Sequence, residues 1–246
     1  MDKWYLNFFY GVAQDFWIKT VPKKITDPEV RFIMDVIGPV EGKFLLDVLC
    51  GFGRHAIELA ERGYKVTGVD ISREYIYELK QTAWKAKFPL EALEGDILSI
   101  EINKLFDGIY CLGNSFGYFD HEGMDLFIQK IAGWLKSGGK FILHTAMAAE
   151  TILPNFQEKE EVTIGDINLL MHHVYNTGES FIETNYSFFR AGVTERRVSR
   201  HYIYTLAEIK KMLLAVGLET TDVYSSVAKA QYNLKDPQLY LVAVKK

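Results

Sequence analysis

Short apolar runs alternate regularly with amphipathic helical patterns between residues 43 and 146, and this alternation constrains the fold more than any other feature. The apolar runs are rich in Val, Ile, Leu and Phe, as expected for strands that are buried on both faces of a sheet. Strand patterns occupy residues 43–50, 64–70, 90–96, 106–113 and 140–146, and helical patterns occupy 54–63, 72–87 and 124–139. This order predicts βαβ units, a mostly parallel sheet and right-handed crossovers.

Local signals mark the ends of several predicted helices. Asp27 followed by Pro28 predicts a helix start, with Asp27 as the N-cap and Pro28 in the first turn. The glycines that end the pattern over 124–139 predict the end of that helix. Thr205 and Glu208 have the spacing of a capping box and predict the start of another helix.

The pattern of the chain changes near residue 155. Three runs rich in β-branched and aromatic residues follow, separated by the hairpin signals NTGE and RAGV, and they predict an antiparallel insertion over 155–204. The α/β pattern then resumes and ends with strands at 218–225 and 238–246. We therefore expect one α/β domain over 1–246, with an aromatic helical segment at 1–26. The insertion is expected to form a lid or a dimer contact.

Charge and apolar patterning argue against several classes of protein. Lys and Arg number 28 against 32 Asp and Glu, and no basic arm is present, so we expect no nucleic-acid partner. No apolar run approaches the length of a membrane span, and the N-terminus lacks the basic region of a signal peptide. Cys50 and Cys111 show no metal-ligand spacing, so we expect reduced thiols and no bound metal. We also expect a cytoplasmic protein that is a monomer or a homodimer.

A glycine-containing turn, DVLCGFGRHA, joins the first predicted strand to a helix. Gly51 and Gly53 allow the backbone to approach a ligand closely, and the helix N-terminus that follows presents unpaired N–H groups. The turn also satisfies the GxGxxA form of the dinucleotide fingerprint. An NAD(P)-dependent oxidoreductase therefore remains an alternative to another adenosine-binding protein.

Acidic residues end the next two predicted strands. Asp70 lies seventeen residues beyond Gly53, where a carboxylate can accept hydrogen bonds from both ribose hydroxyls. Asp96 ends the third strand, where it could bind an adenine amino group. Ile71 and Ile97 each follow one of these acids and could enclose the adenine ring.

Taken as a set, LLDVLCGFGRHAIELAERGYKVTGVDIS, LEGDIL and FDGIYCLGNSFGYF resemble the class I S-adenosylmethionine-dependent methyltransferases. The resemblance covers about residues 27 to 246 and implies a Rossmann-like, doubly wound sheet of seven strands, mostly parallel, with a terminal antiparallel pair. It also implies S-adenosyl-L-methionine as cofactor and S-adenosyl-L-homocysteine as product. Leu49 departs from the family pattern, because DxGxGxG places a glycine there.

The resemblance assigns a cofactor site residue by residue. Asp47 and the turn at Gly51, Phe52 and Gly53 would surround the methionine portion of the cofactor. Asp70 and Ile71 would contact the ribose and adenine, Asp96 and Ile97 the adenine, and Leu112 and Gly113 would pass beneath the methionine. Trp17 is a further candidate, because aromatic faces stabilise a sulfonium; Tyr10, Phe116 and Tyr118 share that property.

The loop after the fourth strand indicates the class of acceptor. GNSFGY lacks the (D/N)PPY sequence of enzymes that methylate exocyclic amines of bases, and the loop resembles those of small-molecule methyltransferases. We expect methyl transfer to nitrogen or oxygen of a small molecule, with Asn114, Tyr118 and His173 as catalytic candidates. A noncatalytic partner protein on the same fold is the remaining alternative.

Overall fold

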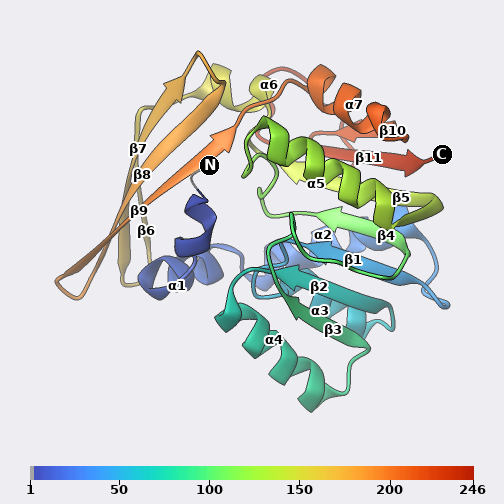
Figure 1. Ribbon diagram of the computed structural model, residues 1–246. Helices are drawn as coiled ribbons and strands as arrows, with labels where there is room; N and C mark the ends of the chain where they lie inside the picture. The colour runs from blue at the N-terminus through green and yellow to red at the C-terminus, as the bar shows by residue number, and fades with distance from the viewer. Residues whose placement is uncertain (1–2) are drawn as a thin grey trace.

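A mostly parallel sheet of seven strands forms the centre of the computed structural model, which describes residues 3–246 (Figure 1). The strand order is β10-β11-β5-β4-β1-β2-β3. The strands are β1 Phe44–Val48, β2 Lys65–Asp70, β3 Leu90–Glu94, β4 Phe106–Cys111, β5 Leu135–Thr145, β10 Leu218–Tyr224 and β11 Leu239–Lys245. Only β11 runs antiparallel to both of its neighbours, β5 and β10. The predicted sheet and its terminal antiparallel pair are therefore confirmed.

Helices cover both faces of this sheet (Figure 1). Alternate residues of each strand point to opposite faces, so Leu45 packs among α2 and α3 whereas Leu46 packs among α5 and α7. The helices are α2 Lys23–Ile37, α3 Arg54–Glu61, α4 Arg73–Ala86, α5 His121–Trp134, the short α6 Ala149–Ile152 and α7 Leu206–Ala215. The fold is doubly wound, as the alternation of strands and helices predicts.

Two helix ends differ from the sequence-based prediction. α2 begins at Lys23 rather than after Asp27, because Pro22 supplies the extended backbone before it; Pro28 then lies inside the helix. The N–H that Pro28 lacks costs one helical hydrogen bond, and the buried side chains of α2 offset that cost. α5 ends at Trp134 without a glycine cap, because the next residue, Leu135, is buried in β5.

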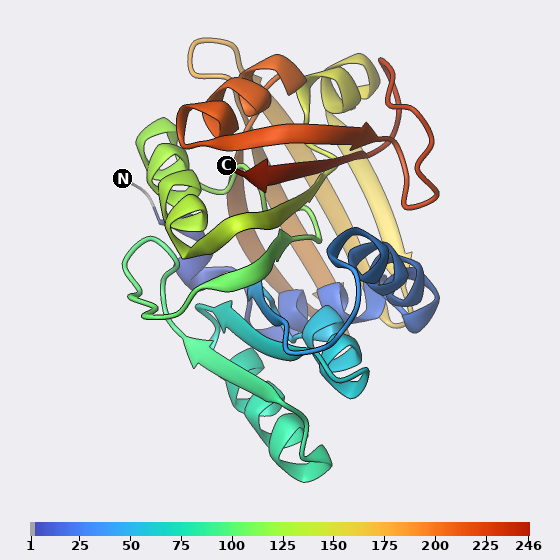
Figure 2. The same cartoon turned by 90° about the vertical axis from the view of Figure 1, so that its right-hand side faces the viewer.

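A second, antiparallel sheet is formed by β6 Lys159–Ile164, β7 Ile167–Asn176, β8 Phe181–Arg190 and β9 Val193–Tyr202. The predicted meander is present with four strands rather than three, since Gly165, at φ +60°, turns the chain within the first predicted run. Figure 2 shows this sheet behind the main sheet. In Figure 1 it stands at the end toward which β2, β3 and β4 point.

The aromatic N-terminal segment lies between the two sheets. It consists of the 3-10 helix η1 Trp4–Asn7 and of α1 Gly11–Thr20. Phe8 and Phe16 pack against Phe188 of β8 in a separate apolar cluster. Residues 4–20 therefore pack on the second sheet and bridge it to the carboxyl ends of the main strands (Figure 1).

Across residues 3–246, no helix is long and apolar enough to cross a membrane. The same residues contain no group of three or more His, Cys, Asp or Glu side chains that could hold a metal ion.

Candidate active site

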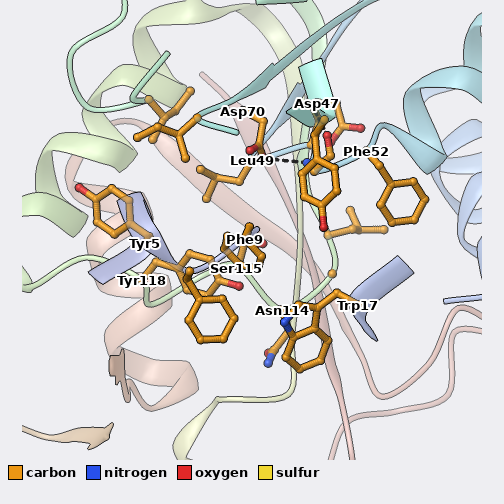
Figure 3. A pocket seen from close by; sticks show the side chains of 18 of the residues that line it. Tyr5, Phe9, Trp17, Asp47, Leu49, Phe52, Asp70, Asn114, Ser115 and Tyr118 are labelled. Carbon is orange, nitrogen blue, oxygen red and sulfur yellow. Dashed lines mark hydrogen bonds between the residues drawn. The ribbon is translucent and has the colours of Figure 1, made fainter. Parts of the chain in front are cut away.

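A pocket opens at the carboxyl ends of β1 to β4, beneath the N-terminal segment and against the second sheet (Figure 3). This is the edge at which parallel α/β sheets bind ligands. Twelve of the fourteen predicted site residues line it: Trp17, Asp47, Gly51, Phe52, Asp70, Ile71, Asp96, Ile97, Leu112, Gly113, Asn114 and Tyr118. Gly53 and His173 do not.

In the turn after β1, every second residue from 49 to 53 lies in the left-handed backbone region. Leu49, Gly51 and Gly53 have φ values of 57°, 55° and 76°. A Cβ on Gly51 would meet nothing within 4 Å, so this glycine leaves open space at the pocket wall. A Cβ on Gly53 would lie 2.5 Å from Leu79 Cδ1 of α4, so the positive φ and the packing of α4 both favour glycine at this position.

Leu49 adopts the conformation that glycine would supply in the family pattern. A leucine in this region costs about 1–2 kcal/mol relative to an ordinary backbone conformation. Its side chain lines the pocket and packs at the edge of the main core. The turn therefore follows the same backbone path without the glycine, and the backbone of Leu49 is strained where a glycine would not be.

Asp70 ends β2 and is fixed by two backbone donors. Its Oδ2 accepts a hydrogen bond from Gly51 N at 2.7 Å, and its Oδ1 accepts one from Ser72 N at 2.9 Å. Burial raises the pKa of Asp70, while these N–H groups oppose the rise. Each carboxylate oxygen has a second lone pair, so both can still accept a ribose hydroxyl from the pocket.

Asp96 follows β3 and is held from both sides. Its Oδ1 accepts a hydrogen bond from Leu98 N at 3.0 Å, and its Oδ2 accepts one from Lys3 Nζ at 2.7 Å. No motif pointed to Lys3, which lies 93 residues from Asp96 along the chain. The N-terminal segment is thus tied to the carboxylate expected to bind adenine.

Arg54, the residue after Gly53, was missed as a site residue although it opens α3. Its guanidinium donates to Thr26 Oγ1 at 3.1 Å and forms a buried ion pair with Glu29. A Cβ on Gly113 would lie 4.0 Å from Arg54 Nη2, so the guanidinium also faces the loop after β4. It lines the pocket beside Asp47.

Glu29 holds Arg54 in this orientation. His55 Nε2 lies 2.9 Å from the Glu29 carboxylate, and burial lowers the pKa of His55, so this histidine is neutral and donates its Nε2–H. Burial would raise the pKa of Glu29, but the hydrogen bonds from His55 and Arg54 outweigh it and hold the pKa at about 2. Glu29 is therefore an anion buried in the α2–α3 contact.

Asp47, at the end of β1, is only 2% exposed. Burial raises its pKa, although the nearby Tyr110 hydroxyl and Arg54 favour the carboxylate. Its Oδ2 forms no hydrogen bond with any described residue. An ammonium group bound at this end of the pocket would supply the missing donor.

The loop after β4 contributes Asn114 and Tyr118. Asn114 has φ +69°, and its Oδ1 accepts hydrogen bonds from Ala146 N at 2.8 Å and from Thr145 Oγ1 at 3.2 Å. Its amide is thereby fixed to the end of β5. Tyr118 is half-buried between Trp4 and His201, each with its ring centre 4.8 Å away in an edge-to-face arrangement.

The structure does not support the position predicted for His173. It lies on β7, where Nδ1 is 2.8 Å from Thr184 Oγ1, and β8 and β9 separate it from the main sheet. Two histidines line the pocket, His55 of α3 and His201 of β9, and Tyr186 and Ser199 line it with His201 on the side of the second sheet. The sequence pattern of β7 could not place this strand relative to the pocket.

These residues fit S-adenosylmethionine. Asp70 and Asp96 provide carboxylates for an adenosine, and Ile71 and Ile97 line the same wall. The unpaired Oδ2 of Asp47 and the guanidinium of Arg54 lie near the expected methionine end, where an amino and a carboxylate group need partners. When bound, this cofactor supplies a methyl group on a cationic sulfur.

Comparison with known proteins agrees with this geometry. Residues 45–139 match a family model described as a methyltransferase domain. A glycine/sarcosine N-methyltransferase of Aphanothece halophytica is 24% identical over 89% of this chain and 82% of its own. A cypemycin N-terminal methyltransferase of a Streptomyces species is 29% identical over 83% of this chain and 84% of its own.

Solved structures show the same fold. The CcbJ methyltransferase from Streptomyces caelestis matches with a TM-score of 0.83 at 14% identity, over 100% of both chains. The family-model match covers the cofactor half of the pocket, and the two relatives extend the similarity over most of the chain. The family-model match, these relatives and the shared fold support a class I S-adenosylmethionine-dependent methyltransferase.

Proposed function

We propose that this enzyme transfers a methyl group from S-adenosylmethionine to a nitrogen or an oxygen of a small-molecule acceptor. The observation that supports this proposal most strongly is a single pocket with two unlike halves (Figure 3). Asp47, Asp70 and Asp96 lie in the half formed by the strand ends. Aromatic side chains from the N-terminal segment and the second sheet form the other half.

In this proposal the strand-end half binds the cofactor. Asp70 accepts hydrogen bonds from the ribose, Asp96 from the adenine amino group, and Ile71 and Ile97 pack on the adenine. Leu112 and Gly113 pass beside the methionine portion, with Gly51 and Phe52 opposite. Arg54 is added to the predicted set as the partner of the methionine carboxylate, because a guanidinium suits a carboxylate in fixed geometry.

The enzyme's own contribution to the reaction is mainly positioning. Direct displacement requires the nucleophile in line with the sulfur–methyl bond, and correct placement supplies much of the rate. Asn114, fixed to β5, and Tyr118, wedged between Trp4 and His201, are the residues proposed to place the acceptor. His173 is left out, because it does not line the pocket.

The roof over the pocket favours a small acceptor. Residues of η1, α1, β8 and β9 close the pocket on the side away from the strand ends. We propose that the chain forms one continuous domain in which residues 155–204 act as a lid. A dimer contact is the alternative role for these residues. The relatives named above are, by their names, a glycine/sarcosine N-methyltransferase and a cypemycin N-terminal methyltransferase, which supports nitrogen as a methyl acceptor.

We further propose where the protein is located, which partners it lacks and how many copies it assembles from. Both cysteines, Cys50 and Cys111, are free, which suits a reducing compartment, and we propose a cytoplasmic location. A net charge of −4 without a basic arm supports the absence of a nucleic-acid partner. We propose a monomer or a homodimer.

Calorimetric titration with S-adenosylhomocysteine tests the proposed function, with NADH titrated in parallel. Micromolar binding of S-adenosylhomocysteine alone supports it and justifies a screen of amines and hydroxylated metabolites as methyl acceptors. Binding of NADH alone would instead favour a dinucleotide enzyme. Protein that binds neither, after removal of any cofactor retained through purification, would favour a noncatalytic role.

A further inference from the structure

The acceptor half of the pocket contains no charged side chain among the described residues. The charged groups that line the pocket are Asp47, Arg54, Asp70 and Asp96, all in the cofactor half. The acceptor half is lined instead by rings and neutral polar groups, including Trp4, Phe9, Tyr118, Tyr186 and His201; Trp17, predicted as a cofactor contact, is also uncharged. A charged acceptor would lose its hydration there without gaining a partner.

Most polar groups in the acceptor half already bond to one another. The Tyr186 hydroxyl and Ser199 Oγ are 3.1 Å apart, and Trp4 Nε1 donates to the Tyr118 carbonyl oxygen at 3.3 Å. Such pairs satisfy the groups that form them and leave little for a ligand. The Trp17 indole N–H also lines the pocket and has no partner among the described residues, but it can only donate. A group that accepts the hydrogen of a nucleophile must therefore be found elsewhere.

His201 retains an unused acceptor nitrogen. Its Nε2 lies 3.4 Å from the carbonyl oxygen of Asn114, and because a carbonyl can only accept, Nε2 carries the proton. Nδ1 consequently has a free lone pair, and no hydrogen bond from residues 3–246 reaches it. The ring is held in place by edge-to-face contact with Tyr118 at 4.8 Å and by Trp4 at 5.9 Å.

The surroundings of His201 keep it neutral. Burial lowers its pKa to about 4, the Asn114 carbonyl opposes this change, and His173 lowers the pKa slightly further. No carboxylate is among these causes. The imidazole is therefore neutral at neutral pH, and its unprotonated nitrogen can accept a hydrogen bond.

We propose that His201 Nδ1 is the recognition point for the methyl acceptor, which is an uncharged ring compound that donates an O–H or a weakly basic N–H. This inference rests on the proposed function and specifies its substrate class. The aromatic walls contact the faces and edges of the acceptor's ring. The histidine accepts the hydrogen of the nucleophile and so orients its lone pair.

Small aromatic probes test this assignment on the full chain saturated with S-adenosylhomocysteine. We expect phenol to bind about three- to tenfold more tightly than toluene, the effect of one neutral hydrogen bond. Benzoate and benzylammonium are expected to bind at least about tenfold more weakly than phenol, because their charges find no partner. Calorimetry or ligand-observed NMR gives the affinities.

Two variants isolate the role of Nδ1. His201→Phe retains a ring against Tyr118 but has no acceptor, so the preference for phenol over toluene should fall to less than about twofold. His201→Asn places an amide oxygen near the position of Nδ1 and should retain much of the preference. Both variants should bind S-adenosylhomocysteine as the parent does, which verifies that fold and cofactor site are intact.

Each other result counts against the assignment. An unchanged preference in His201→Phe, or no preference in the parent, would exclude Nδ1 as the recognition point. Tighter binding of benzylammonium than of phenol would show that the aromatic walls bind a cation instead. Failure of the parent to bind S-adenosylhomocysteine would overturn the proposed function itself, and this inference with it.

Discussion

Replacement of Leu49 by alanine and by glycine tests whether the turn after β1 is strained. Leu49 has φ +57°, whereas the family pattern has glycine at this point. Both variants remove the leucine side chain and differ from each other only in Cβ. Their difference in stability therefore reports the backbone conformation and not the packing lost with the side chain.

The expected difference follows from two opposing terms. Alanine in the left-handed region costs about 1–2 kcal/mol, which glycine does not incur. Glycine gains more conformational freedom on unfolding, which costs about 0.4–1 kcal/mol relative to alanine. Leu49→Gly should thus be more stable than Leu49→Ala by about 1 kcal/mol, or about 2–4 °C in Tm for a chain of this size.

Gly133 offers a matched control for this comparison. It lies on the exposed side of α5, and a Cβ there would meet nothing within 4 Å. Gly133→Ala should stabilise the protein by about 0.5–1 kcal/mol, the opposite preference from that at position 49. Urea unfolding and thermal melting give both values. A Leu49→Ala protein as stable as Leu49→Gly, or more stable, would refute the account of the strained turn.

Three further outcomes follow from the site. Asp70→Ala should weaken binding of S-adenosylhomocysteine by at least about tenfold in calorimetry, and unchanged affinity in a folded variant would exclude the ribose contact. Glu29 has a pKa of about 2, below its unfolded value of 4.5, so its carboxylate stabilises the fold above pH 4.5 and this contribution, about 3 kcal/mol, is lost as the pH falls toward 2. Urea midpoints of the parent should therefore fall more steeply between pH 6 and pH 3 than those of Glu29→Gln, and parallel slopes would contradict the assignment. Lys3→Ala should change the affinity for S-adenosylhomocysteine, because Lys3 is paired with Asp96. The control Lys19→Ala removes an exposed ion pair with Asp166 and should leave the affinity unchanged. Equal effects of the two variants would show that the Lys3–Asp96 contact has no role at the site.

The cofactor half could be predicted from the sequence because its residues are local. Asp47, Asp70 and Asp96 each follow a strand with a clear apolar pattern, and the carboxyl ends of neighbouring parallel strands meet at one edge. Gly53 was assigned to the ligand because a pattern of glycines cannot separate close approach to a ligand from close packing of helices. The 2.5 Å contact with Leu79 is visible only in three dimensions.

The acceptor half could not be predicted in the same way. Trp4 and His201 lie almost two hundred positions apart in the chain, yet their rings are 5.9 Å apart. That contact depends on how the second sheet is placed against the main sheet. The hydrophobic periodicity of a sequence predicts single strands and helices, but not the relative placement of two sheets. The same limit explains the choice of His173, since alternation along β7 gives the face of a residue but not the distance of its strand from the pocket.

The two halves of the pocket are supported by different parts of the fold. The cofactor half is supported by the main sheet and by α3, so its geometry depends on the most deeply buried residues of the chain. The acceptor half depends on β8, β9 and the N-terminal segment. The N-terminal segment shares a smaller cluster with β7 and β8, around Phe8, Phe16 and Phe188. Substitutions in that cluster can therefore move the walls around an acceptor without moving Asp70 or the turn at Gly51. A change of acceptor at constant affinity for S-adenosylhomocysteine is thus expected from residues of the second sheet, and not from the strand ends on which the family resemblance depends.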